Sequence, residues 1–133
     1  MLDATSVGAG VVATRVGACL VLTLGEDLAE PALERARSLV VEELRGPRVD
    51  AVVFDLSALL YLDSREFTEL RSLARMTGML GARTIFVGFR PGIIVHLMRL
   101  DVDITGMHVA LGLNEALQAL GIVAGEPDAR HAP

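Results

Sequence analysis

The feature that most constrains the fold is a regular alternation between short apolar segments and longer segments with helical periodicity. Residues 51–56 (AVVFDL) and 83–89 (RTIFVGF) are almost wholly apolar, as expected of strands covered on both faces. Between them, apolar residues recur every three or four positions over residues 64–80, which predicts an amphipathic helix. Its predicted buried stripe consists of Phe67, Leu70, Leu73, Ala74, Thr77 and Leu80. Strands that alternate with helices favour a mainly parallel sheet with helices packed against it.

The rest of the chain extends this pattern. Residues 11–15 and 19–24 are rich in β-forming residues, and Gly17 in the gap between them predicts an antiparallel hairpin. Pro31 suits the first turn of a helix, and Asn114 is a candidate cap for the last helix. A short strand is expected around residues 107–109. Three further helices are expected, over residues 28–45, 91–100 and 115–121.

The expected architecture is one α/β domain. Its sheet is mainly parallel but mixed, with an N-terminal antiparallel edge hairpin and about four α-helices. With 133 residues, the chain is long enough for one domain with a core and too short for two. We assign residues 11–121 to the domain, 1–10 to a flexible N-terminus and 122–133 to a flexible, polar C-terminal tail.

Composition narrows the possible functions. All twelve basic residues are Arg, the net charge is −5 and no basic cluster stands out, which argues against a nucleic-acid partner. No apolar run reaches about 18 residues, and no basic–apolar leader opens the chain. We therefore expect a cytoplasmic protein without a membrane span. Cys19 stands alone within an apolar segment and is expected to be a small buried hydrophobic residue.

Sequence patterns for metals, cofactors and catalysis are missing. His96, His108 and His131 have no second ligand three or four residues away, so structural roles are expected for His96 and His108. The phosphate-binding patterns G-x-x-x-x-G-K-[ST] and G-x-G-x-x-G are absent, as is the G-x-S-x-G turn of hydrolases. Asp55 and Asp63 are available as paired carboxylates, but no substrate-binding pattern accompanies them. We expect no cofactor, no metal and no enzymatic activity.

The segment Asp63-Ser64-Arg65-Glu66 lies where the apolar segment gives way to the predicted helix. Asp and Ser are both favoured N-cap residues, and the spacing from Asp63 to Glu66 fits a capping box. The same position allows modification, because a phosphate on Ser64 would lie beside unpaired N–H groups at the positive end of a helix. It would add about −1.5 to −2 charges next to Asp63 and Glu66, so repulsion would offset part of the gain. The residues alone leave both roles open.

Four segments, in the same order, resemble the STAS family, which comprises sulphate-transporter domains and anti-sigma factor antagonists. They are ACLVLTLGEDL, AVVFDLSALLYLDS, LARMTGMLGARTIFVGFRP and GMHVALGLNEAL, and they cover about residues 10–121. The glycine-rich patterns of the last two segments resemble the stressosome branch of the family. The short chain is similar to its single-domain, RsbS-like type.

This resemblance implies a mechanism. In the family, a switch serine/threonine kinase phosphorylates the serine of the Asp-Ser pair, which corresponds to Ser64 here. The unphosphorylated protein would hold an RsbT-like kinase in a homo- or hetero-oligomeric assembly with longer, RsbR-like STAS paralogues, and phosphorylation would release the kinase. The alternative is an anti-anti-sigma factor similar to SpoIIAA or RsbV that binds an anti-sigma factor kinase directly.

The resemblance also points to residues around the serine. Because loops at the carboxyl ends of parallel strands share one sheet edge, Arg90 is expected near Ser64, either paired with its phosphate or solvated. Two positions depart from the family: Arg65-Glu66 is charged where members often have apolar residues, and Val87 replaces the second phosphorylated Thr of sensor-type paralogues. The expected partner-binding or phosphate-neighbouring residues are Asp63, Arg65, Glu66, Arg90 and Pro91.

Overall fold

The computed structural model of the protein describes residues 3–100 and 107–121. Within these residues, the strands are β1 (Asp3–Gly8), β2 (Val11–Val16), β3 (Cys19–Leu24), β4 (Ala51–Asp55), β5 (Arg83–Val87) and β6 (Val109–Ala110). The helices are α1 (Glu30–Leu44), α2 (Ser64–Met79), α3 (Pro91–Leu100) and α4 (Leu113–Leu120). The expected alternation of strands and helices after the hairpin is confirmed.

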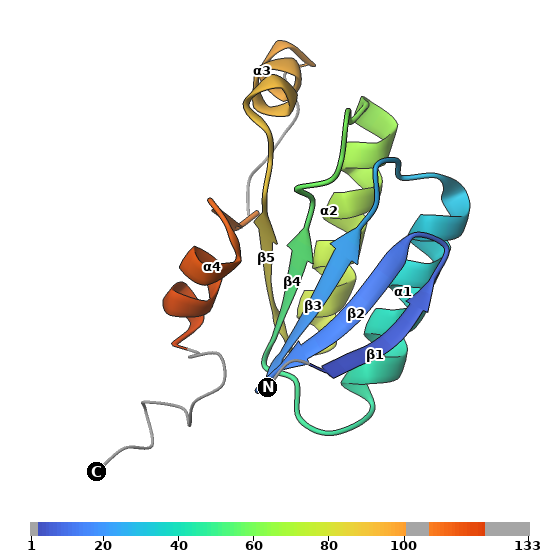
Figure 1. Ribbon diagram of the computed structural model, residues 1–133, viewed down its shortest axis with the longest axis vertical. Helices are drawn as coiled ribbons and strands as arrows, with labels where there is room; N and C mark the ends of the chain where they lie inside the picture. Colours follow the sequence, from blue (N-terminus) through green and yellow to red (C-terminus); the bar gives the residue numbers. More distant parts are fainter. Residues whose placement is uncertain (1–2, 101–106, 122–133) are drawn as a thin grey trace.

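The strands form one mixed sheet in the order β1-β2-β3-β4-β5-β6. The first three strands run antiparallel, and β3 to β6 run parallel. Helices α1 and α2 cover one face, α4 packs on the other, and α3 lies beyond the end of the sheet at which the parallel strands finish (Figure 1). The carboxyl ends of β3, β4 and β5 therefore share the edge at which α2 and α3 begin.

Residue alternation along the parallel strands builds two cores. In β4, Val52 and Phe54 point into the core beneath α1 and α2, whereas Ala51 and Val53 point toward α4. All four are fully buried, which confirms that this strand is covered on both faces. Phe54 stacks on Phe86 of β5 with ring centroids 5.3 Å apart, so the two central strands are also linked by an aromatic pair.

The first residues of the chain differ from the flexible N-terminus expected for residues 1–10. Asp3–Gly8 form β1, which pairs with β2 as the edge strand of an antiparallel meander. Gly8 faces Val11, so the connection has two residues, Ala9 and Gly10, both with positive φ (52° and 77°). A two-residue turn with positive φ at both central positions matches the twist of the paired strands. This turn allows the chain to extend the sheet by β1.

Two helix ends also differ from expectation. Leu80 was expected in the buried stripe of the second helix but is the C-cap of α2 and 48% exposed, because the chain turns there toward Gly81. Asn114 was expected to cap the last helix, but Gly112 is the N-cap and Asn114 lies inside the first turn of α4. Both corrections concern helix boundaries. The expected C-terminal tail, 122–133, and His131 lie outside the described residues.

Candidate functional site

The start of α2 is fixed by a complete capping box. The backbone N–H of Glu66 donates to Asp63 Oδ1 at 2.7 Å, and the backbone N–H of Asp63 donates to Glu66 Oε1 at 3.0 Å. Glu66 is only 8% exposed, so its carboxylate is used within the fold rather than displayed to solvent. The predicted capping box is confirmed, and Asp63 rather than Ser64 is the cap.

Ser64 is the first residue of α2 and is exposed. Its backbone carbonyl accepts a hydrogen bond from the Thr68 hydroxyl at 2.9 Å. Within residues 3–100 and 107–121, the hydroxyl of Ser64 makes no hydrogen bond of its own. The side chain therefore presents a hydroxyl to solvent at the positive end of a helix, and the cap does not depend on it.

The loop between β4 and α2 is held on both sides. Asp55 Oδ1 accepts hydrogen bonds from the backbone N–H and the hydroxyl of Ser57, at 3.0 and 2.7 Å, which forms a local turn at the end of β4. Leu56 N–H donates to the carbonyl of Val87, and Leu60 N–H donates to the carbonyl of Glu26. Asp55 is thus a turn-forming residue, and the loop is attached to the ends of both β5 and β3.

Arg90 belongs to the same edge and holds the β4–α2 loop. Its Nε donates to the carbonyl of Ser57 at 3.1 Å. Gly88, with φ +83°, permits this close approach, because a Cβ there would lie 2.7 Å from the backbone nitrogen of Ser57. The structure thus places Arg90 beside the β4–α2 loop. In the described part of the chain, no hydrogen bond or ion pair joins it to Ser64. Pro91 is the exposed first residue of α3.

Ion pairs between α1 and α2 flank the site. Arg65 pairs with Glu30 at 3.2 Å, and Glu30 also pairs with Arg37 at 3.0 Å. Arg37 extends the network to Glu69 of α2 at 3.0 Å. Its hydrogen bond with Glu34, and then its contact with Glu69, raise the pKa of its guanidinium. The charged Arg65 therefore has a structural partner on the neighbouring helix.

Large apolar side chains are exposed close to the serine. Leu60 and Tyr61, in the loop that leads into α2, are 56% and 61% exposed. Sequence reasoning did not single out these two residues or Ser57, Gly88 and Glu30. The turn at the end of β4 could have been inferred from the Asp-x-Ser pattern of residues 55–57. Gly88 could have been inferred as an isolated glycine after a strand.

The other candidate residues stand apart from this site. His96 and His108 are exposed, on α3 and just before β6. Cys19 is buried in β3, and burial raises the pKa of its thiol to about 11. No group of three or more metal-ligating side chains occurs among the residues that the structure describes. None of the described helices is both long and apolar enough to span a bilayer.

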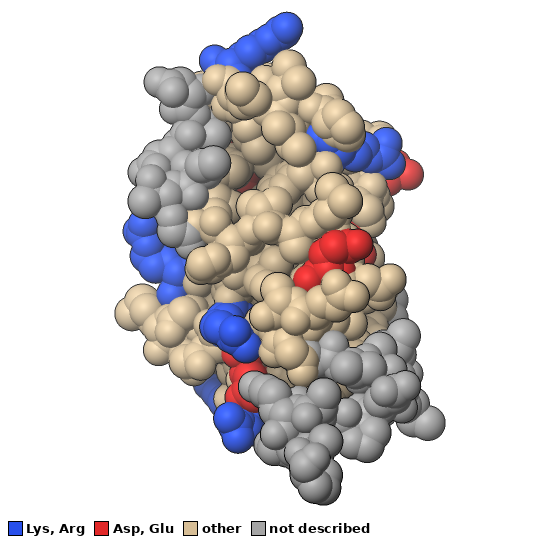
Figure 2. Space-filling model, turned by 90° about the vertical axis from the view of Figure 1, so that its left-hand side faces the viewer, with Lys and Arg blue, Asp and Glu red and all other residues tan. Residues whose placement is uncertain are grey.

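Figure 2 shows the side of the molecule that carries α3, β6 and α4. Uncharged residues occupy most of this face, and the charged side chains form separate spots. On α3, β6 and the turn before α4, the exposed apolar residues include Ile94, Val95, Met98, Val109 and Leu111. Ile94, Met98 and Val109 also line one pocket with Phe67 of α2, so this uncharged face extends to α2 and is a candidate contact surface.

Comparison with solved structures finds the same fold in bacterial signalling proteins. RsbS of Moorella thermoacetica, in a serine-to-glutamate variant, matches with a TM-score of 0.69 and 24% identity, over 83% of this chain and 93% of that one. A chain from the molecular architecture of the stressosome matches with a TM-score of 0.69 and 25% identity, over 81% and 94%. The anti-sigma factor antagonist SpoIIAA, unphosphorylated, matches with a TM-score of 0.57 and 17% identity, over 90% and 97%.

SpoIIAA in its phosphorylated form also matches. No protein-family model matches the sequence, and the curated proteins gave no significant match. The resemblance to STAS proteins drawn from the sequence is thus confirmed by the fold.

Proposed function

We propose that this chain, which has the STAS fold of the RsbS and SpoIIAA structures, is a non-enzymatic scaffold controlled by phosphorylation of Ser64. The unphosphorylated chain holds an RsbT-like switch serine/threonine kinase within an assembly that includes longer, RsbR-like STAS paralogues. Phosphate on Ser64 releases the kinase, which then acts in stress signalling.

The division of labour at the start of α2 carries this proposal. Asp63 and Glu66 cap the helix, while the neighbouring Ser64 is exposed and its hydroxyl is not used by the fold. A kinase can therefore reach this hydroxyl, and adding a phosphate breaks no hydrogen bond of the cap. A residue that switches binding without altering the fold needs this independence.

Release follows from charge at a docking surface. Leu60 and Tyr61 offer exposed apolar area next to Ser64, and tyrosine is enriched at protein interfaces. A phosphate would add about −1.5 to −2 charges at this surface, beside the exposed carboxylate of Asp63. Arg65 is already paired with Glu30, so docking would require burying a strongly hydrated and only partly neutralised group.

The uncharged face of α3 and β6 supports the assembly part of the proposal. Exposed apolar side chains on these elements suit a contact with another STAS domain. The second candidate is a SpoIIAA-like antagonist that binds an anti-sigma factor kinase as a small species, favoured by the coverage of 90% of the chain. Light scattering of the chain with its STAS paralogues separates the two: large particles support the scaffold, and small species support the antagonist.

Kinase binding by a Ser64→Asp variant tests the proposal. The variant places a carboxylate at the phosphate position and is expected to bind the switch kinase at least about tenfold more weakly, equivalent to about 1.4 kcal/mol. Ser72→Asp is the matched control, because Ser72 is exposed on the same helix two turns further on. It should bind like wild type. Unchanged affinity in a folded Ser64→Asp protein would refute the proposal.

A further inference from the structure

An apolar pocket lies between the first turn of α2, helix α3 and β6. Its volume is about 300 Å³, at the lower end of the usual range for small-ligand sites, about 300–1,000 Å³. Phe67 of α2 and Leu97 of α3 line its inner side and are only 2% and 8% exposed. Ile94, Met98 and Val109 line its outer side and are exposed. The pocket is therefore a recess with a buried floor, not a flat apolar surface.

Helix α3 has more apolar surface than the domain covers. Six of its ten residues are large and apolar, yet only Ile93 and Leu97 are buried. A helix that is apolar on most of its sides is normally enclosed by other elements. Helix α3 instead lies beyond the end of the sheet, and Ile94 and Met98, one turn apart, face the pocket (Figure 1). A ligand in the pocket would cover side chains that the domain itself leaves open.

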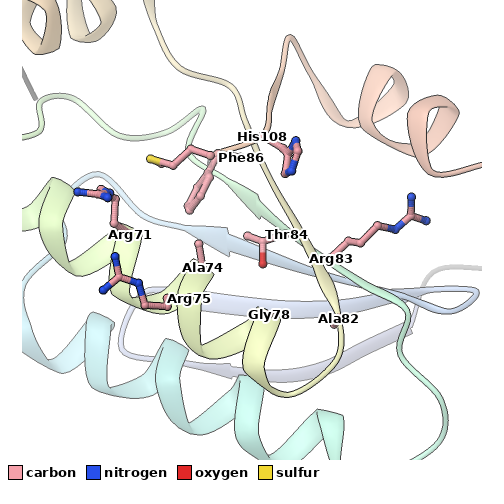
Figure 3. A pocket seen from close by; sticks show the side chains of 10 residues that line it. Arg71, Ala74, Arg75, Gly78, Ala82, Arg83, Thr84, Phe86 and His108 are labelled. Carbon is pink, nitrogen blue, oxygen red and sulfur yellow. The ribbon is translucent and has the colours of Figure 1, made fainter. Parts of the chain in front are cut away.

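The lining of this pocket selects an uncharged ligand. All seven side chains that line it are apolar, so it offers no titratable group, hydroxyl or amide side chain. A charged group placed there would lose its hydration without gaining a partner, which costs free energy. Figure 3 shows a neighbouring hollow between α2 and the start of β5, where Arg83 points away from Arg71 and Arg75. Those three arginines do not converge, so that hollow does not form a site for an anion.

Aromatic rings lead from the core into the apolar pocket. Phe54 stacks on Phe86, and the ring centroid of Phe86 lies 6.4 Å from that of Phe89, which lines the pocket. Phe67 supplies a second ring to the lining. Aromatic rings pair favourably at centroid distances of about 4.5–7 Å. The two methionines of the lining adapt to the shape of a ligand and make favourable sulfur–ring contacts. The pocket therefore favours a flat aromatic group.

We propose that this pocket binds a small, uncharged aromatic molecule. Its ring lies among Phe67, Phe89 and the two methionines, and Ile94 covers part of its outer side. Burial of apolar surface drives the binding, and no charge is needed. Because Phe67 lies one helical turn after Ser64, the ligand contacts the turn that begins at the serine. The lining does not include Ser64 or its capping residues, so the inference does not depend on the proposed function.

Methyl-detected NMR with toluene as the probe tests this inference, because toluene is aromatic and carries no charge or hydrogen-bonding group. It should bind in the millimolar range or tighter, as expected of so small a ligand. The methyl resonances of Leu97, Met98 and Met107 should shift, whereas that of Val40, buried beneath α1, should not. Benzoate, in which a carboxylate replaces the methyl group, should bind at least about tenfold more weakly. Equal binding of benzoate, or no shift at about 5 mM toluene, would overturn the proposal.

Two neighbouring residues of α3 provide matched variants that locate the site. Ile94 and Val95 are 45% and 48% exposed, but of the two only Ile94 lines the pocket. Ile94→Asn places an amide in the lining and should weaken toluene binding at least about fivefold. Val95→Asn should change it less than about twofold. Equal effects of the two variants would show that toluene binds elsewhere, and the proposal would be wrong.

Light scattering on the same samples separates a ligand site from a contact between copies of the chain. Toluene affinity that stays the same over the range of protein concentration supports the proposal. If the chain instead dimerises, and toluene reaches the pocket methyl groups only after dilution to the monomer, then a second copy fills the pocket. That result would contradict the proposal.

Discussion

Replacing Asp63 with Ala removes the side-chain half of the capping box at the start of α2. The backbone N–H of Glu66 then loses its 2.7 Å acceptor, and because Glu66 is 8% exposed, water replaces that acceptor poorly. Loss of an N-cap usually costs about 0.5–2 kcal/mol, and this burial places the expected loss in the upper half, about 1–2 kcal/mol. For a domain of this size, that lowers the melting temperature by about 4–8 °C.

Urea unfolding followed by far-UV circular dichroism measures this loss of stability. Ser64→Ala is the matched control, since it changes the adjacent residue and leaves both capping hydrogen bonds in place. Its free energy of unfolding should stay within about 0.5 kcal/mol of wild type. If Ser64→Ala destabilised the protein as much as Asp63→Ala, the serine would be a structural cap, and the separation of capping from switching would be wrong.

Further predictions concern the loop contact and the buried thiol. Gly88→Ala should destabilise the fold by more than about 1 kcal/mol, because Gly88 has a positive φ and a Cβ there would lie 2.7 Å from the Ser57 nitrogen. In the control Gly92→Ala, in α3, the added Cβ meets no atom within 4 Å, so this variant should not be destabilised. Thermal melts compare the two variants. Cys19 should react far more slowly with a thiol reagent in native protein than in urea, since burial raises its pKa to about 11. The stability that the neutral thiol contributes is complete below its ordinary pKa of 9.0 and is lost as pH rises to about 11, so the urea midpoint should fall across this window in wild type and fall less in Cys19→Ala.

The fold was largely predictable because burial leaves a direct trace in the sequence. Ala51–Asp55 and Arg83–Val87 are short apolar segments, and both are central parallel strands. The edge strand β1 left a weaker trace, since its formation depends on pairing with β2 and on the positive φ of Ala9, which an alanine rarely adopts. Helix ends such as Leu80 and Gly112 depend on local turns that periodicity does not specify.

The site was predictable where it is local in sequence. Asp63 and Glu66 are three residues apart, so their capping box could be inferred from spacing alone. The partners of Arg65 and Arg90 could not, because Glu30 is 35 residues from Arg65 and Ser57 is 33 residues from Arg90. Contacts of this kind arise only when the folded sheet brings separate loops to one edge. The apolar pocket beside Phe67 likewise joins α2, α3 and β6, which no single stretch of sequence reveals.

Phosphorylation-site mapping tests the central claim most directly. The purified chain and its Ser64→Ala variant are incubated with ATP and each switch-type serine/threonine kinase of the source organism, and phosphate is located by peptide mass spectrometry. We predict one phosphate on Ser64 in the wild-type chain and none in the variant. Modification of another exposed hydroxyl, such as Ser57 or Ser72, or equal phosphate incorporation into the Ser64→Ala chain, would contradict the assignment of Ser64 as the switch.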